Sequence, residues 1–128
     1  MLDAPDHHCG VGAVVDPTGK RNVAEFAGPL LRRLEHRGSG GCGAGWIDAE
    51  TGELQVLHKE GRARNVLPEL QANTSSLIIH ALYRTNPHSK PHPYVVNYQG
   101  HRTAAAFNGN IPETPKEQKA REYLDAHG

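Results

Sequence analysis

Short runs of apolar residues, separated by glycine and proline, predict several β-strands along the chain. Residues 10–16 are expected to form a short buried strand that ends at the turn Pro17-Thr18-Gly19. Residues 76–84 give the strongest strand signal in the sequence. Two hairpins are also expected, from 44–49 and 53–58 around Glu50-Thr51-Gly52, and from 94–98 and 102–107 around Gln99-Gly100.

Apolar residues at helical spacing indicate a helix over residues 22–36, for which Gly38 is a natural end. Its apolar stripe consists of Val23, Phe26, Ala27, Leu30, Leu31 and Leu34. Gly28-Pro29 should kink or restart this helix, because proline lacks a backbone donor. Shorter helices are expected at 63–71 and at about 115–127, where the second follows a capping-box pattern. Antiparallel strands with a helix near each end of the chain define an α+β fold.

Composition and charge exclude several classes of protein. With 128 residues, 37% of them hydrophobic, the chain can bury one small core. Its 14 Lys and Arg residues balance 14 Asp and Glu residues, so we expect neither nucleic acid nor a membrane as a partner. The start of the chain has no apolar signal segment, and two cysteines then indicate free thiols in a reducing, cytoplasmic location.

Nine histidines invite a metal-site interpretation, but the sequence pattern does not favour it. The chain contains no C-x-x-C and no H-E-x-x-H pattern, and Cys9 lies far from Cys42. We therefore expect the histidines to lie in solvent or to line a pocket. No metal and no cofactor are expected.

Four short motifs follow one another along the chain and carry the candidate chemistry. They are Cys9-Gly10-Val11-Gly12, His36-Arg37-Gly38, His80 through Asn86 (HALYRTN) and Asn108-Gly109-Asn110. Each motif alone has an ordinary structural explanation, such as a buried cysteine or a two-residue hairpin turn. Their combination in this order is specific.

Together the four motifs resemble the class II, or N-terminal nucleophile, glutamine amidotransferases. The similarity is greatest to the glutaminase domains of amidophosphoribosyltransferase and of glutamate synthase, and it covers residues 6–128. It implies an αββα sandwich of two antiparallel sheets. It also implies that residues 1–8 are a leader removed on maturation, and that residues 9–128 are the N-terminal portion of the domain.

The resemblance assigns the catalytic roles. Cys9, once it is the first residue, attacks the side-chain amide of glutamine and forms a thioester, releasing ammonia and then glutamate. An α-amine, whose pKa is ordinarily about 7.7–8.0, can take the thiol proton of the same residue. The Asn108 side chain and the Gly109 backbone N–H supply the oxyanion site. Cys42 is expected to be a small turn residue and not a second nucleophile.

Substrate binding departs from the family pattern at one position. The family strand runs His-x-Arg-(Tyr/Phe)-Ser-Thr, whereas here Leu82 occupies the arginine position and Arg84 follows two residues later. Because residues i and i+2 of a strand share a face, Arg84 can reach the same pocket and hold the α-carboxylate of glutamine. Arg37 and Thr85 are assigned to the same substrate site.

Three functions remain open at this point. The first is a glutaminase that feeds ammonia to an acceptor domain or a synthase partner. The second is an N-terminal nucleophile amidase that acts on another amide. Leu82 at the arginine position of the family favours this second function. The third is a non-catalytic fragment or regulatory domain. The acidic residue that binds the α-amine in the family is expected after Gly128, so the chain alone is expected to be incomplete and weakly active.

Overall fold

The computed structural model describes residues 9–36, 39–63, 70–84 and 89–107, together with Tyr123 and Ala126. The elements in these ranges are β1 (Gly10–Val15), the 3-10 helix η1 (Val23–Phe26), α1 (Ala27–Leu34), β2 (Gly41–Ile47), β3 (Leu54–Glu60), β4 (Ser76–Leu82), β5 (Tyr94–Tyr98) and β6 (His101–Ala105). Four strands form an antiparallel sheet in the order β1-β4-β2-β3, and β5 pairs with β6 in a separate antiparallel hairpin. The chain therefore has an α+β fold with antiparallel sheets.

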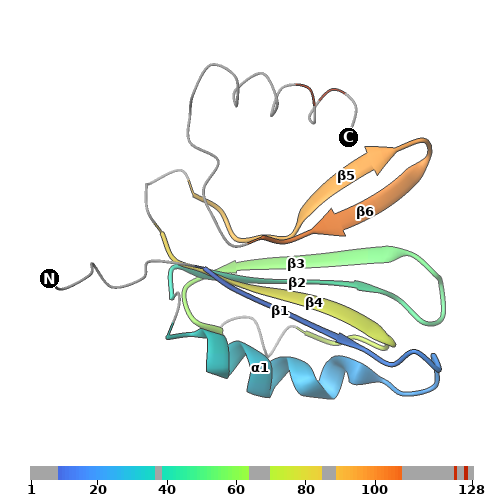
Figure 1. Ribbon diagram of the computed structural model, residues 1–128, viewed down its shortest axis with the longest axis horizontal. Helices are drawn as coiled ribbons and strands as arrows, with labels where there is room; N and C mark the ends of the chain where they lie inside the picture. The colour runs from blue at the N-terminus through green and yellow to red at the C-terminus, as the bar shows by residue number, and fades with distance from the viewer. Residues whose placement is uncertain are drawn as a thin grey trace, which may run out of the picture.

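The four-stranded sheet lies between α1 on one face and the β5–β6 hairpin on the other (Figure 1). Alternation along β4 shows the two faces. Leu77 and Ile79 belong to the core that α1 covers, whereas His80 stacks on His92 on the hairpin side. The sequence of β4 is apolar on both faces because both are covered.

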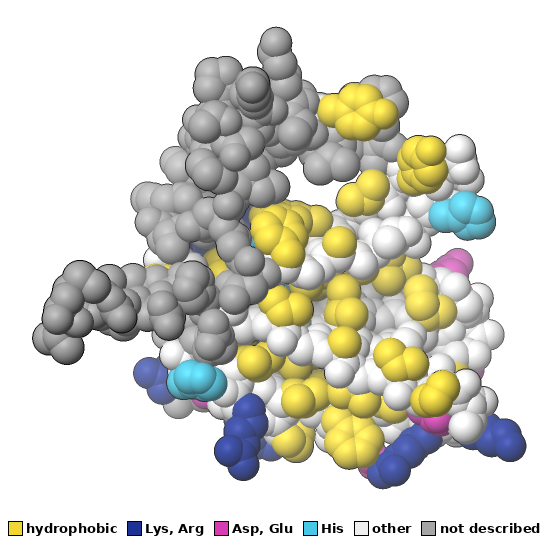
Figure 2. Space-filling model, in the orientation of Figure 1, with side chains coloured by type: hydrophobic (Ala, Val, Ile, Leu, Met, Phe, Trp, Pro, Cys, Tyr) yellow, Lys and Arg dark blue, Asp and Glu magenta, His cyan; other side chains and the backbone are white. Residues whose placement is uncertain are grey.

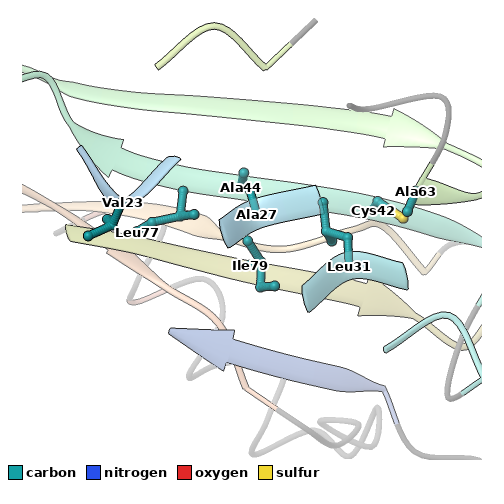
Figure 3. Close-up of a cluster of buried hydrophobic side chains, with 8 residues drawn as sticks. All are labelled: Val23, Ala27, Leu31, Cys42, Ala44, Ala63, Leu77 and Ile79. Atoms are coloured by element: carbon teal, nitrogen blue, oxygen red, sulfur yellow. The ribbon is translucent and has the colours of Figure 1, made fainter. Parts of the chain in front are cut away.

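A small hydrophobic core fills the space between α1 and the sheet (Figure 3). Its fully or almost fully buried members are Val23, Ala27, Leu31, Cys42, Ala44, Ala63, Leu77 and Ile79. Leu31 and Ile79 have no exposed surface, so truncating Leu31 to alanine should cost about 2–5 kcal/mol. The apolar stripe predicted for the helix is thus the side that packs on the sheet, except for Phe26, which is 36% exposed.

The helical segment restarts next to Gly28-Pro29, which is one of the two outcomes predicted. It changes from 3-10 to α geometry one residue before Gly28, between Phe26 and Ala27. Pro29 lies in the first turn of α1, where a backbone N–H has no helical partner to lose. Upstream, the Asn22 side chain caps η1 by accepting a hydrogen bond from the Ala24 N–H.

The predicted strands are confirmed, with most of their bounds shifted by about one to three residues. The strands expected at 44–49 and 53–58 are Gly41–Ile47 and Leu54–Glu60, joined by a turn in which the Gly52 N–H donates to the Asp48 carbonyl. Residues 64–69 of the helix predicted at 63–71 lie outside the described residues. Of the helix predicted near the C-terminus, only Tyr123 and Ala126 are described, and both are helical.

Strand β2 begins earlier than predicted because its glycines make room for another segment. Gly41, Gly43 and Gly45 face the hairpin side, where residues 91–93 cross the sheet. A β-carbon on Gly43 would lie 1.6 Å from the His92 carbonyl oxygen. Side chains at these positions would push residues 91–93 off the sheet, so the glycines are part of a strand and not of a loop.

Some apolar side chains remain exposed, as Figure 2 shows across the middle of the molecule, between the hairpin and the helix. Val11 and Val15 on the edge strand β1 are 40% and 63% exposed. Among the described residues, no helix is long and apolar enough to cross a membrane.

Candidate functional site

Cys9 lies immediately before β1, at the end of the sheet where β4 finishes. The residue is only 7% exposed. The Tyr83 backbone N–H donates to the Cys9 Sγ atom at 3.4 Å, and the Tyr83 carbonyl oxygen lies 3.8 Å from the same sulfur. The thiol is therefore held at a fixed position by the backbone that follows β4.

Strand alternation places Cys9 on the hairpin side of the sheet. The neighbouring Gly10 faces the other side, because a β-carbon there would touch Leu34 of α1. His80, directly opposite Val11 in the β1–β4 register, also lies on the hairpin side. Cys9 and His80 therefore share a face near one end of the sheet.

Cys42 has a different environment from Cys9. It is not the turn residue predicted from the sequence, because it lies within β2 and forms part of the core beneath α1. Burial, followed by the negative charge of Glu35, raises the pKa of the Cys42 thiol to about 11. A thiol with that pKa stays protonated at neutral pH, so Cys42 is a poor nucleophile.

Arg84 follows β4 and joins three segments at the same end of the sheet. One guanidinium nitrogen donates to the Ser89 carbonyl oxygen at 2.6 Å, and another donates to the Gly40 carbonyl oxygen at 3.2 Å. The second nitrogen also forms an ion pair with Glu60 at the end of β3. A substrate carboxylate that binds Arg84 must therefore compete with the Glu60 carboxylate.

Four of the predicted site residues lie outside the described residues: Arg37, Thr85, Asn108 and Gly109. Their sequence neighbours are described. Gly40 and Arg84 are in contact at the end of the sheet that also holds Cys9. Phe107, the residue before Asn108, binds through its N–H to the Nδ1 atom of His92 at 3.2 Å.

A cluster of rings, of which those of His80 and His92 are buried, lies between β4 and the hairpin. The rings of His80 and His92 stack with centroids 4.0 Å apart, and the His92 ring also contacts Tyr94 and Phe107. The His92 N–H donates to the His80 Nδ1 atom at 3.1 Å. His58 on β3 reaches the Pro93 carbonyl oxygen through its Nε2 atom at 2.8 Å.

The buried histidines of this cluster are neutral. Burial, with a smaller contribution from His92, lowers the pKa of His80 to about 3. Burial and the nearby His58 lower the pKa of His92 to about 4. Because the Nδ1 atom of each ring accepts a backbone N–H, the proton of each neutral ring sits on Nε2. Among the described residues, the buried His80 Nε2 atom has no hydrogen-bond partner.

Sequence reasoning missed the role of this cluster, because it placed the histidines in solvent or along a pocket. The available signal was His80 inside the strongest predicted strand and His92 between two prolines.

Within the described residues, no group of three or more His, Cys, Asp or Glu side chains is arranged to hold a metal ion. Comparison with models of known protein families and with curated protein sequences gave no match.

Proposed function

We propose that the chain is the N-terminal part of a class II glutamine amidotransferase domain, with Cys9 as its nucleophile. This proposal rests on the convergence of several residues at one end of the sheet. Residues from motifs far apart in the sequence, or next to them, meet at one end of the four-stranded sheet: Cys9, Gly40, Tyr83 and Arg84. A hydrolytic site for an amide needs such convergence of a nucleophile with groups that bind the substrate.

The layer order supports the same proposal. A helix, a four-stranded antiparallel sheet and an antiparallel hairpin lie one upon another, which corresponds to three layers of an αββα sandwich. The nucleophile precedes the first strand, which suits a residue that becomes the chain terminus when residues 1–8 are removed. The two cysteines also differ in their suitability as nucleophiles, because Cys42 is buried in the core and its thiol stays protonated.

The proposed reaction uses Cys9 as both base and nucleophile. Its free α-amine takes the thiol proton, and the thiolate attacks the side-chain carbonyl carbon of glutamine. The Asn108 amide and the Gly109 N–H stabilise the oxyanion of the tetrahedral intermediate. The intermediate collapses by breaking the carbon–nitrogen bond, and the α-ammonium returns its proton to the departing ammonia. Water then hydrolyses the thioester to glutamate, and the ammonia passes to an acceptor domain or a synthase partner.

A paired substitution tests this function. Glutamate release from glutamine should be abolished by Cys9→Ala and largely kept by Cys42→Ala, measured on the full natural chain. The Cys42 variant is the matched control because it removes the same atom elsewhere in the sheet. Full activity in the Cys9 variant would overturn the proposal.

A second candidate is an N-terminal nucleophile amidase for a different amide. The observation that favours it is the occupied guanidinium of Arg84, which already binds Glu60 and two carbonyl oxygens. An amide substrate without an α-carboxylate would not need that arginine. Comparing hydrolysis of glutamine with that of an amide lacking the α-carboxylate distinguishes the two functions.

A further inference from the structure

Strand β4 and Tyr83, the residue after it, hold two parts of the proposed site: the Cys9 thiol and the backbone that leads to Asn108. His80 and Tyr83 lie three positions apart along the chain. The Tyr83 N–H binds the Cys9 sulfur, and His80 accepts the N–H of His92. His92 in turn accepts the N–H of Phe107, and the sequence continues from Phe107 directly to Asn108 and Gly109.

The link from β4 to Phe107 is rigid for steric reasons. Residues 91–93 lie directly on the glycines of β2, with the His92 carbonyl oxygen in the place that a Gly43 side chain would occupy. His92 is 4% exposed, and its ring contacts the rings of His80 and Phe107. Neither the backbone nor the ring of His92 can move without disturbing the sheet face.

Both rings are neutral, and each acts as a hydrogen-bond acceptor for a backbone N–H. Each Nδ1 atom accepts a backbone N–H, from His92 in a buried position and from Phe107 in a partly buried one, and leaving such a donor unpaired is costly. An apolar side chain of the same size would fill the space but would leave the N–H unpaired. The choice of histidine at both positions is therefore explained by the acceptor atom and not by volume alone.

We propose that His92, supported by His80, is a positioning residue that fixes Phe107 and so sets the start of the Asn108-Gly109 oxyanion segment relative to Cys9. This inference rests on the proposed glutaminase function. Neither histidine is assigned a contact with substrate; both act through the backbone of Phe107. A disturbed link should misplace the oxyanion donors while leaving the Cys9 thiol intact.

Two variants of His92 separate the acceptor from the ring. In His92→Asn the side-chain oxygen stands the same number of bonds from the backbone as Nδ1 and can accept the Phe107 N–H. In His92→Leu the volume is kept and the acceptor is lost. We expect the leucine variant to lower kcat by about 10- to 100-fold with a smaller change in KM, and the asparagine variant to recover most of that loss.

Two further measurements on the same variants exclude a general loss of structure. Alkylation of Cys9 by iodoacetamide, which needs no oxyanion site, should proceed at the wild-type rate in both variants. Amide hydrogen exchange at Phe107 should be slow in the wild type and in the asparagine variant, and fast in the leucine variant.

The outcomes separate this inference from the proposed function. If the wild type hydrolyses glutamine and the leucine variant keeps its kcat, the positioning role is wrong and the glutaminase stands. Equal protection of the Phe107 amide in all three proteins would also overturn the positioning role. If the wild type itself does not hydrolyse glutamine, the glutaminase fails, and with it the catalytic meaning of the link. The exchange at Phe107 then still reports whether His92 fixes that backbone.

Discussion

The carbonyl oxygen of His92 lies 1.6 Å from the point where a β-carbon on Gly43 would stand, so that this glycine and that carbonyl share one position on the sheet. The contact joins β2 to a segment far along the chain. It also places the His92 ring against the His80 ring, where His92 accepts a hydrogen bond from the Phe107 N–H. The arrangement of the candidate site therefore depends on the absence of a side chain at residue 43.

Gly43→Ala should destabilise the protein by about 3 kcal/mol or more, because the neighbour is backbone and cannot turn aside. Gly12→Ala is the matched control on β1. Its β-carbon would meet only side-chain atoms, with the nearest, on Ile79, at 3.1 Å, and should cost about 1 kcal/mol or less. Denaturant unfolding of both variants measures the difference. Equal free energies of unfolding would show that residues 91–93 do not lie on β2.

Stability should depend on pH through His80 and His92. Their folded-state pKa values, about 3 and about 4, lie below the ordinary value of 6.5, so the unfolded chain binds more protons in between. The stabilisation is complete above pH 6.5 and is lost as the pH falls towards about 4 for His92 and about 3 for His80. Each histidine contributes up to about 1.4 kcal/mol per pH unit within that window.

Chemical denaturation between pH 5 and pH 7.5 measures this dependence. The free energy of unfolding should rise up to about pH 6.5 and then level off. His92→Asn removes one titrating group and should give a shallower slope over the same range. A free energy of unfolding that falls as the pH rises from 5 to 6.5 would mean that the histidines are not buried as neutral rings.

The strands and the fold class could be predicted from the sequence because they depend on local alternation and on turn residues such as Gly52 and Gly100. The start of β2 could not. Gly41 and Gly43 have the composition of a loop, and the reason that they form a strand is the segment at 91–93, which is distant in sequence. The restart next to Gly28-Pro29 was predictable, because proline is compatible with the first turn of a helix, where Pro29 lies in α1.

The candidate site was predictable only in part, for a similar physical reason. The sequence pattern singled out Cys9 and Arg84 as chemistry-bearing residues. It could not show that Arg84 binds Glu60, since that contact follows from the register of β2 with its two neighbours. It also gave no sign that the His92 ring accepts a hydrogen bond from the Phe107 N–H.

The ion pair with Glu60 makes a test of Arg84 sharper. Arg84→Lys keeps the charge and loses the planar fork, so KM for glutamine should rise several-fold if this guanidinium binds the α-carboxylate. Glu60→Gln removes the competing carboxylate and should lower KM. The Glu60 side chain is 72% exposed, so this change should hardly alter the melting temperature. Unchanged KM in both variants would assign Arg84 a structural role only.

Asn108→Ala tests the oxyanion assignment. Turnover should fall by about 10²- to 10³-fold with a smaller change in KM and an unaltered melting temperature, as expected when an oxyanion donor is removed. A turn residue would behave in the opposite way, with a lower melting temperature and nearly normal turnover. Thermal unfolding and steady-state kinetics on the same preparation distinguish the two.

The most direct test of the account is to locate the nucleophile by covalent labelling. The natural chain, purified from cells, is treated with the glutamine-like electrophile 6-diazo-5-oxo-norleucine and analysed by intact and peptide mass spectrometry. We predict one adduct per chain, on Cys9, in a peptide that begins with Cys9 because residues 1–8 have been removed. An adduct on Cys42, or full glutamine hydrolysis by a chain that still carries residues 1–8, would contradict the account.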